Sequence, residues 1–249
     1  MNTIQKIVVN HFNLLASKYD YYSLKRKKYI DKINEIVCDK ISQFSNPNVI
    51  DIGCGTGSRA EKIKEITNCN MTCCDISEKM LEIASRKKID KVFQADILEV
   101  SDKVEDNKYD VVLCLFNVFG YLSCDEDRSK AMRELASILD NKGMLIIDVM
   151  NLFHTGEGLS FKKNICQIAC EMLISAFSND KKVGDIEFNV EVEHKFIAGW
   201  VHGFSDRKMK QLFKKAGLKV IEKRIIGYDS GEEKKLFWKG QLFYVCSKK

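Results

Sequence analysis

The chain has 249 residues, of which 45% are hydrophobic, and a formal net charge of +5. The length predicts one large domain, or a core domain that carries a smaller elaboration. The composition is that of a soluble globular protein with a full core, and no apolar run approaches the ~20 residues that a membrane-spanning helix needs. The first residues, MNTIQKIVVNHFN, lack the long apolar stretch of a secretory signal, so we expect a cytoplasmic protein without a membrane partner.

The cysteines and the charge pattern argue against a disulfide-rich protein, a metal-binding protein and a nucleic-acid-binding protein. Many of the ten cysteines lie inside strand-like or helix-like runs, which indicates buried thiols in a reducing compartment rather than a disulfide scaffold. No second cysteine pair or histidine stands at zinc-finger distance, so we expect no metal site. Basic residues are interleaved with acids, so the charge does not indicate a nucleic-acid partner.

The first clear element is an amphipathic helix over residues 25–44. Its apolar side chains recur at helical spacing, and they are Ile30, Ile33, Val37, Ile41 and Phe44. This helix precedes the first predicted strand, so we assign residues 1–46 to an N-terminal helical segment.

From residue 48 the chain alternates apolar strands with helices. The predicted strands are 48–53, 70–76, 91–97, 109–118 and 143–151, and the predicted helices are 59–67, 77–87 and 126–139. Near-continuously apolar strands joined by helices predict a parallel sheet covered on both faces. Ser77 is typical of a helix N-cap, and Gly143 of a helix stop. Residues 47–151 form the predicted α/β core.

The alternation of apolar strands and helices stops after residue 151. Residues 152–203 contain alternating strand-like runs, GDIEFNVEVEHKF being the clearest, and predict a small antiparallel insertion. A capped amphipathic helix (204–218) and two strands (219–228 and 239–248) follow. We expect residues 204–249 to complete the core of a doubly wound α/β domain.

The stretch NVIDIGCGTGSRAEKI carries the first functional signal. Gly53, Gly55 and Gly57 follow an apolar strand and precede a helical pattern, as in loops that bring backbone close to a nucleotide. The dinucleotide fingerprint would need its third glycine at Ser58, and a serine there leaves a nicotinamide site open. A P-loop is excluded because no Lys-Ser or Lys-Thr follows the glycines.

Acidic residues at the strand ends add a second signal. Asp75 ends the second strand, where a carboxylate can accept both hydroxyls of a ribose, and Asp96 ends the third. In a parallel sheet these residues converge with Asp51 on one crevice. A negative crevice is unfavourable for a pyrophosphate and suits a ligand that carries positive charge.

Taken in order, these motifs resemble one known family. VIDIGCGTG, CCDIS, FQADI, YDVVLCLFNVFGYL and GMLIIDV resemble the successive motifs of class I methyltransferases, and HFNLLASKYD resembles their N-terminal segment, which folds over the cofactor. The resemblance covers residues 11–149 and the last helix and strand pair. It implies a seven-stranded mixed sheet with an antiparallel last strand, the cofactor S-adenosyl-L-methionine and the product S-adenosyl-L-homocysteine.

The resemblance also implies roles for individual residues. The three glycines, with Cys54 between them, bring backbone to the methionyl part and the ribose, and Asp51 helps to hold the amino group directly or through water. Asp75 binds the ribose hydroxyls and Asp96 accepts the adenine amino group. The remaining implied cofactor contacts are Tyr19, Ile76, Met80, Ala95, Ile97, Leu115, Phe116, Asn117 and Tyr121. Taken singly, each of these residues is also consistent with capping or core packing.

The sequence says less about the methyl acceptor. His154 and His202 are candidate bases, and no Asn-Pro-Pro-Tyr motif follows the fourth strand, which argues against adenine- and glutamine-methylating relatives. One modest insertion at 152–203 favours transfer to nitrogen or oxygen of a small molecule. Three alternatives stay open: methylation of RNA or protein, a nicotinamide-dependent oxidoreductase, and a non-catalytic cofactor-binding subunit. The sequence does not decide between monomer and homodimer.

Overall fold

The computed structural model describes residues 3–104, 108–154, 166, 169, 183–192 and 195–249. Its N-terminal part is helical: α1 (Thr3–Leu15), η1 (Ala16–Lys18), α2 (Tyr19–Ser23), η2 (Leu24–Arg26) and α3 (Lys27–Ile41). The predicted helix over 25–44 is therefore confirmed within shorter bounds, and its buried side chains include Ile33, Val37 and Ile41.

The core alternates strands and helices as predicted. Its elements are β1 (Asn48–Ile52), α4 (Ser58–Thr67), β2 (Asn70–Asp75), α5 (Glu78–Ala84), β3 (Lys91–Gln94), α6 (Val100–Val104), β4 (Tyr109–Cys114), η3 (Val118–Tyr121), α7 (Asp125–Ser137) and β5 (Leu139–Val149). After the hairpin β6 (Asp185–Val192) and β7 (Lys195–His202) come α9 (Asp206–Lys215), β8 (Leu218–Ile226) and β9 (Gln241–Lys248). Ser77 caps α5 by accepting the Met80 N–H at 3.2 Å, which confirms the predicted cap.

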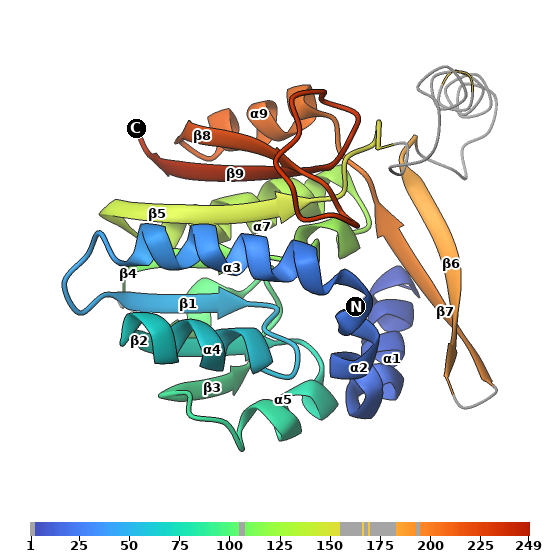
Figure 1. Ribbon diagram of the computed structural model, residues 1–249, viewed down its shortest axis with the longest axis horizontal. Helices are drawn as coiled ribbons and strands as arrows, with labels where there is room; N and C mark the ends of the chain where they lie inside the picture. Colours follow the sequence, from blue (N-terminus) through green and yellow to red (C-terminus); the bar gives the residue numbers. More distant parts are fainter. Residues whose placement is uncertain (1–2, 105–107, 155–165, 167–168, 170–182, 193–194) are drawn as a thin grey trace.

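The strands form one seven-stranded sheet in the order β3-β2-β1-β4-β5-β9-β8 (Figure 1). Strands β1 to β5 pair in parallel, while β9 is antiparallel to both β5 and β8. The strand order reverses between β1 and β4, and ligands bind at such a switch point beyond the carboxyl ends of the strands. The predicted doubly wound mixed sheet is confirmed.

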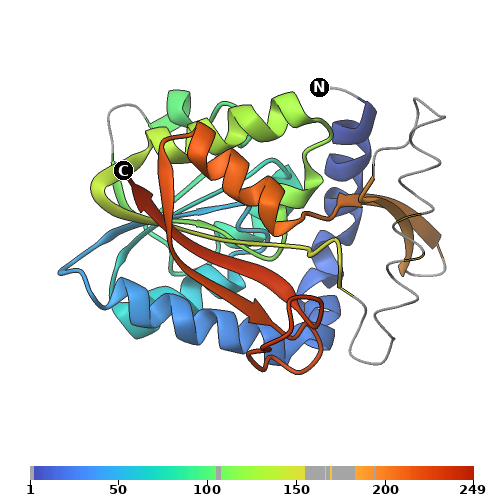
Figure 2. The same cartoon turned by 90° about the horizontal axis from the view of Figure 1, so that it is seen from above.

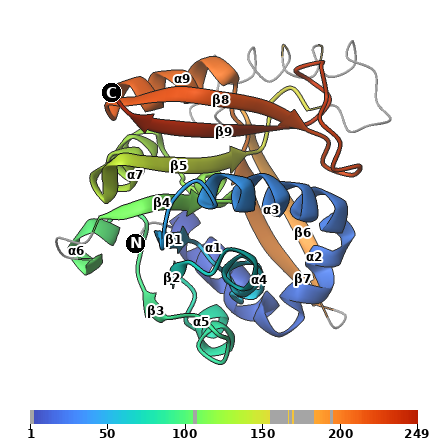
Figure 3. The same ribbon diagram turned by 60° about the vertical axis from the view of Figure 1, so that its left-hand side comes forward.

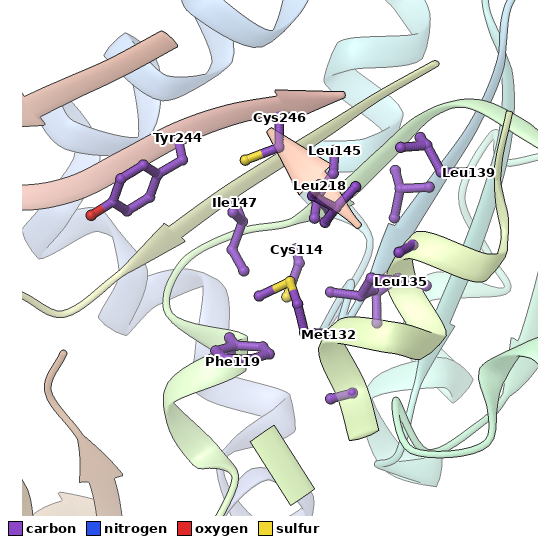
Figure 4. Close-up of a cluster of buried hydrophobic side chains, with 14 of the residues drawn as sticks. Cys114, Phe119, Met132, Leu135, Leu139, Leu145, Ile147, Leu218, Tyr244 and Cys246 are labelled. Atoms are coloured by element: carbon purple, nitrogen blue, oxygen red, sulfur yellow. The ribbon is translucent and has the colours of Figure 1, made fainter. Parts of the chain in front are cut away.

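Helices cover both faces of the sheet, and each face has its own core (Figure 2). Along β1, Val49 faces the cluster under α3 and α4, while Ile50 and Ile52 face the cluster under α7 and α9, as the strand period of two requires. Figure 4 shows the second cluster, where Cys114 and Ile147 of the sheet meet Met132 and Leu135 of α7.

Two sequence interpretations of β4 and β5 were wrong. Gly143 does not stop a helix, because α7 ends at Ser137 and Gly143 lies inside β5, where a Cβ would come 2.9 Å from the carbonyl oxygens of Tyr109 and Asp110. The glycine therefore permits close approach of neighbouring strands. Strand β4 ends at Cys114 rather than at residue 118, because Phe116 and Asn117 have left-handed backbone with φ of +60° and +64°.

The helices α1 and α2 and the hairpin β6–β7 lie beyond the carboxyl ends of the parallel strands (Figures 1 and 3). The run GDIEFNVEVEHKF, predicted as strand-like, contains β6 and the start of β7 in a separate two-stranded sheet. Helix α1 packs on the hairpin, with His11 Nδ1 3.0 Å from the Ala198 carbonyl oxygen. Among the described helices, none combines the length and apolar character needed to cross a membrane.

Candidate functional site

A cavity of about 540 Å³ lies at the carboxyl ends of the parallel strands. The sheet edge forms its floor, the segment from α1 to η2 covers one side, and the hairpin covers another. A volume of this size is in the range of small-molecule and cofactor sites. The cavity therefore lies where the strand order predicts a ligand.

The glycine loop after β1 forms one part of the wall. Gly53 and Gly55 line the cavity, and their φ angles of +72° and +57° are ones that side-chain-bearing residues rarely adopt. A Cβ on Gly53 would come 2.5 Å from the methyl groups of Val118, and one on Gly55 would come 3.4 Å from the Tyr19 ring. The two glycines thus let Val118 and Tyr19 pack directly against the backbone of the loop.

Asp75 is the central polar group of this wall. Its Oδ2 accepts the Gly55 N–H at 2.8 Å, and its Oδ1 accepts the Ser77 N–H at 2.8 Å. Burial raises the pKa of Asp75, and these two backbone donors oppose that rise. Each carboxylate oxygen has a further lone pair, so Asp75 can still accept from the hydroxyls of a ligand.

Asp96, just beyond β3, defines the far end of the cavity. Its Oδ1 accepts the Leu98 N–H at 2.9 Å, and Gln5 of α1 donates to Oδ2 at 3.4 Å. Burial raises the pKa of this carboxyl as well. Apolar side chains surround the two acids at this end: Ile76, Met80, Ala95 and Ile97. The combination suits a flat polar ring bound between apolar faces.

Asp51 lies behind the glycine loop rather than on the cavity wall. It is fully buried, and Arg59 Nη2 lies 3.2 and 3.3 Å from its two carboxylate oxygens. Burial raises the pKa of Asp51, and the charge of Arg59 opposes that rise. Arg59 thus already supplies a cation to Asp51, and contact of Asp51 with a cofactor amino group stays a prediction.

Three polar side chains attach the N-terminal helices to the cofactor side of the cavity. Asp20 of α2 accepts hydrogen bonds from the hydroxyls of Thr56 at 2.5 Å and Ser58 at 2.7 Å. Ser77 Oγ donates to Asn13 Oδ1 of α1 at 2.7 Å, and Gln5 reaches Asp96 as described above. The helical segment therefore closes over the same strand ends that carry the predicted cofactor residues.

The structure brings most of the predicted cofactor residues together. Those that line the cavity are Tyr19, Gly53, Gly55, Asp75, Ile76, Met80, Ala95, Asp96, Ile97, Phe116, Asn117 and Tyr121. Those that do not are Asp51, Cys54, Gly57 and Leu115, which are buried beneath the loop and the sheet edge. Their individual roles toward a cofactor stay predictions.

Neither histidine proposed as a base lies on the cavity wall. His202 is buried at the base of the hairpin, with Nδ1 2.6 Å from Asp185 Oδ1, and burial lowers its pKa despite this carboxylate. The ring of His154 is centred 6.5 Å from that of Tyr228, behind the cavity lining. A catalytic role for either histidine stays a prediction.

Sequence reasoning missed a second polar centre, at the end of β5. Asp148 lines the cavity and accepts hydrogen bonds from the Tyr29 hydroxyl and, at 3.2 Å, from the Asn117 N–H. Asp148 lies near the carboxyl end of the apolar strand β5, as Asp75 does at the end of β2. The rule that acids at the ends of parallel strands meet at one crevice, here called the strand-end rule, would therefore also have indicated Asp148. Tyr29 in α3 and Tyr228 after β8 carried no such signal, because only the tertiary fold brings them to this wall. Among the described residues, no group of His, Cys, Asp and Glu side chains is arranged to hold a metal ion.

Comparisons with known proteins agree with this geometry. Residues 49–143 match the family model described as a methyltransferase domain. The glycine/sarcosine N-methyltransferase of Aphanothece halophytica is 30% identical over 122 residues, which are 47% of this chain and 45% of that protein. The malonyl-[acyl-carrier protein] O-methyltransferase 2 of Ilyobacter polytropus is 33% identical over 110 residues, covering 43% of this chain and 41% of that one.

The chain thus spans about half the length of the curated relatives it matches. Among solved structures, an S-adenosylmethionine-dependent methyltransferase from Clostridium acetobutylicum superposes with a TM-score of 0.65 at 15% identity, covering 93% of this chain and 98% of that one. At that identity the likeness shows a shared fold.

Proposed function

We propose that this chain is a class I S-adenosylmethionine-dependent methyltransferase that transfers a methyl group from that cofactor to nitrogen or oxygen of a small molecule, which the matched methyltransferase domain, the relatives and the shared fold support. One observation carries the proposal: one cavity is lined both by the predicted cofactor residues and by Tyr29, Asp148 and Tyr228, which come from other elements. Two ligands in one such cavity can be held in line for transfer.

The residues of the first end fit the cofactor. Asp75 retains acceptor capacity for ribose hydroxyls and Asp96 for an exocyclic amino group, while Ile76 and Ile97 supply apolar surface for adenine. Gly53 and Gly55 line the same cavity and would present backbone to the methionyl part. When bound, the cofactor supplies a methyl group on a positively charged sulfur.

The second end would receive the acceptor. Tyr29, Phe116 and Tyr228 adjoin one another beside Asp148 at this end. Ile186, Phe188 and Val190 of the hairpin line the same cavity. These walls leave room for a small molecule and favour it over a macromolecule. The chain's contribution to the reaction is then alignment of the two reactants and exclusion of water. Within this proposal residues 1–46 cover the cofactor, 47–151 and 204–249 form the core, and 152–203 select the acceptor.

The name of the first relative supports a small acceptor. The first describes methylation of glycine and sarcosine, whereas the second describes O-methylation of a malonyl group on a carrier protein. Because these matches cover less than half of each relative, neither acceptor is carried over to this chain.

Calorimetric titration with S-adenosylmethionine, S-adenosylhomocysteine and NAD, side by side, tests the cofactor. We expect both sulfur nucleosides to bind and NAD not to bind. Binding of NAD alone would contradict the proposal and favour an oxidoreductase. Tight binding of the sulfur nucleosides without turnover of any acceptor would favour a non-catalytic subunit.

A second experiment tests the size of the acceptor. Transfer of radiolabelled methyl is measured with a panel of amines and alcohols, and separately with total RNA and protein extracts at rising salt. We expect label in the small-molecule fraction. Salt-sensitive labelling of RNA alone would contradict the proposed acceptor class while leaving the methyl donor unchanged.

A further inference from the structure

The second end of the cavity has an unusual composition. Three rings, those of Tyr29, Phe116 and Tyr228, adjoin one another there and are called here the aromatic wall. The ring centroids are 5.2 Å apart for Tyr29 and Tyr228, and 6.4 Å from Phe116 to each of them. Asp148 lines the same cavity and joins the wall through its hydrogen bond from the Tyr29 hydroxyl.

Asp148 is buried without a cation. Its exposed fraction is 2%, and its hydrogen-bond donors are neutral groups, namely the Tyr29 hydroxyl and the backbone N–H groups of Asn117 and Phe116. Among the described residues, none of positive charge forms an ion pair with it, and the charge of Arg59, which acts on it from a distance, is paired with Asp51. A buried carboxylate without a counter-ion is costly, so this carboxylate is suited to a ligand that brings one.

The aromatic wall favours the same kind of ligand. The negative face of an aromatic ring attracts a cation, and the attraction grows when water is excluded. Tyr228 already carries one such contact, since Arg26 Cζ lies 4.3 Å from its ring centroid, and Arg26 is neutralised by Asp229. The wall is also held in a fixed shape, because Phe116 keeps a left-handed φ of +60° that an aromatic residue adopts only under constraint.

The position of this end separates it from the nucleoside end. From β2, which carries Asp75, to β5, which carries Asp148, the sheet order runs through β1 and β4. Three strand spacings amount to roughly 14 Å. A ligand group at Asp148 therefore does not compete with a ribose at Asp75, and the methionyl part of the cofactor has room between them.

We propose that Asp148 and the aromatic wall bind the basic nitrogen of an amine acceptor, so that the enzyme is an N-methyltransferase of a small amine. This inference rests on the proposed function, because methylation requires the cofactor at the other end. Burial raises the pKa of Asp148, which suits a carboxylate that has to accept a proton.

The atoms and charges balance in this scheme. An ammonium that enters the site gives one proton to the Asp148 carboxylate, which frees the nitrogen lone pair. The lone pair forms the new N–C bond while the C–S bond breaks and its electron pair stays on sulfur, so the sulfonium becomes a neutral thioether. The methylated nitrogen then carries the positive charge, which Asp148 stabilises again after its proton passes to solvent.

A pair of isosteres tests the site without relying on turnover. Choline carries a trimethylammonium group, and 3,3-dimethylbutan-1-ol replaces that nitrogen by carbon at nearly the same shape. Both are titrated by ligand-observed NMR into protein saturated with S-adenosylhomocysteine, and again without it. We expect choline to bind about tenfold more tightly than the neutral isostere.

Variants identify the residues responsible. Asp148→Asn should abolish the preference for choline and change the affinity for S-adenosylhomocysteine less than about twofold. Tyr228→Leu should weaken choline binding, whereas Tyr228→Phe, which keeps the ring, should not. The matched control is Asp96→Asn, which alters a carboxylate of the same cavity at the nucleoside end. It should weaken S-adenosylhomocysteine and leave the choline preference intact.

The possible results distinguish an amine site at Asp148 from a cofactor role of Asp148 and from failure of the proposed function. Equal binding of the two isosteres by the wild type would overturn the amine site even if S-adenosylhomocysteine binds. If Asp148→Asn weakens S-adenosylhomocysteine as much as choline, Asp148 serves the cofactor's own amino group and the inference is wrong. If S-adenosylhomocysteine does not bind at all, the proposed function fails, while a choline preference measured without it would still support a cation site at Asp148.

Discussion

Three buried aspartates lie on or just behind the wall of the ligand cavity, and each is stabilised differently. Asp51 has a cation in Arg59, Asp75 has backbone N–H donors, and Asp148 has a tyrosine hydroxyl and backbone N–H groups. Burial raises the pKa of each of these three carboxyls. Asp51 is therefore already paired with a cation away from the cavity, whereas Asp75 and Asp148 line the cavity without one and can face a ligand.

Replacing Asp75 tests the nucleoside end at the level of one residue. We expect Asp75→Ala to weaken binding of S-adenosylmethionine by about 1–3 kcal/mol, because the ribose hydroxyls lose a charged acceptor. Part of the loss comes from the glycine loop, since the Gly55 N–H loses its partner at 2.8 Å. Calorimetric titration measures the change.

Glu78→Ala, at an exposed acid in the first turn of α5, is the matched control and should bind as the wild type does. Circular dichroism establishes that both variants fold. Unchanged affinity in a folded Asp75→Ala variant would remove this residue from the binding site.

Individual site residues could be predicted where a local rule applies. The strand-end rule identified Asp75 and Asp96, which line the cavity, and the same rule applied to β5 would have identified Asp148. Arg59 was missed because it is one helix turn past the loop and its role depends on the buried Asp51 beside it. Tyr29 and Tyr228 come from elements that only the folded chain brings together.

At the level of elements, α2 depends on one side chain for its contact with the glycine loop. Asp20 accepts hydrogen bonds from both Thr56 and Ser58. We expect Asp20→Ala to weaken the binding of S-adenosylhomocysteine about tenfold, chiefly through faster release. The reason is that two hydrogen bonds of about 1 kcal/mol each hold α2 against the glycine loop. Stopped-flow dissociation measures the rate.

Asp39→Ala, at an exposed acid on α3, provides the comparison for the loss of one negative charge. If both variants release the ligand at the wild-type rate, α2 does not act as a cover for the cofactor.

Two buried histidines contact the hairpin, His11 from α1 and His202 within the hairpin itself, so we expect the hairpin to respond to pH. Burial lowers the pKa of His11, which faces the Ala198 carbonyl oxygen and the rings of Phe12 and Phe188. Burial also lowers the pKa of His202, which faces Asp185 and lies near Arg128.

A lowered pKa in the folded state means that the unfolded chain binds protons first. The stability contributed by the neutral histidines is thus complete above their ordinary pKa of about 6.5 and is lost as the pH falls below that value. We expect amide exchange in β6 and β7 to accelerate between pH 7 and pH 5 beyond the intrinsic pH effect. The acceleration should be smaller in His202→Gln, and equal acceleration in both proteins would contradict this role.

The alternation of strands and helices made most elements predictable, and the exceptions have local physical causes. Apolar runs fixed β1, β2 and β3 to within a few residues. The end of β4 was misplaced because two left-handed residues interrupt an apolar run, and periodicity does not report backbone handedness. The strands β6 and β7 pair antiparallel, as predicted for the insertion. Residues 155–165 and 170–182 of the predicted insertion lie outside the described residues.

For the whole molecule, ligand binding and stability are linked because the cavity lies between the sheet and its covering segments. A ligand that binds only the folded state adds about 2.7 kcal/mol at one hundred times its Kd. For a domain of this size that corresponds to roughly 5–10 °C in Tm. We expect this shift with S-adenosylhomocysteine and none with NAD, measured by differential scanning fluorimetry. A shift with NAD alone would contradict the assignment of the cofactor.

The global fold was predictable because its signals are ordered along the chain, from the glycine loop through the strand-end acids to the last strand pair. The order of the motifs along the chain does not predict which residues meet across the cavity. The aromatic wall joins α3, the end of β4 and the segment after β8, which lie far apart in sequence. The division of the chain at residues 46, 151 and 203 into a cover, a core and an acceptor-binding region remains a prediction.

The place of β9 has a consequence for how the protein is made. Residues 241–248 pair with β5, so that Leu145 lies opposite Cys246, although β5 itself ends at residue 149. At ordinary rates of translation, β5 leaves the ribosome roughly 5–20 s before its partner strand. During that interval the nascent sheet ends at an apolar strand with unpaired backbone groups, which is the kind of edge that promotes association with other chains. Folding yield should therefore depend on protection of this strand by chaperones until β9 has been synthesised.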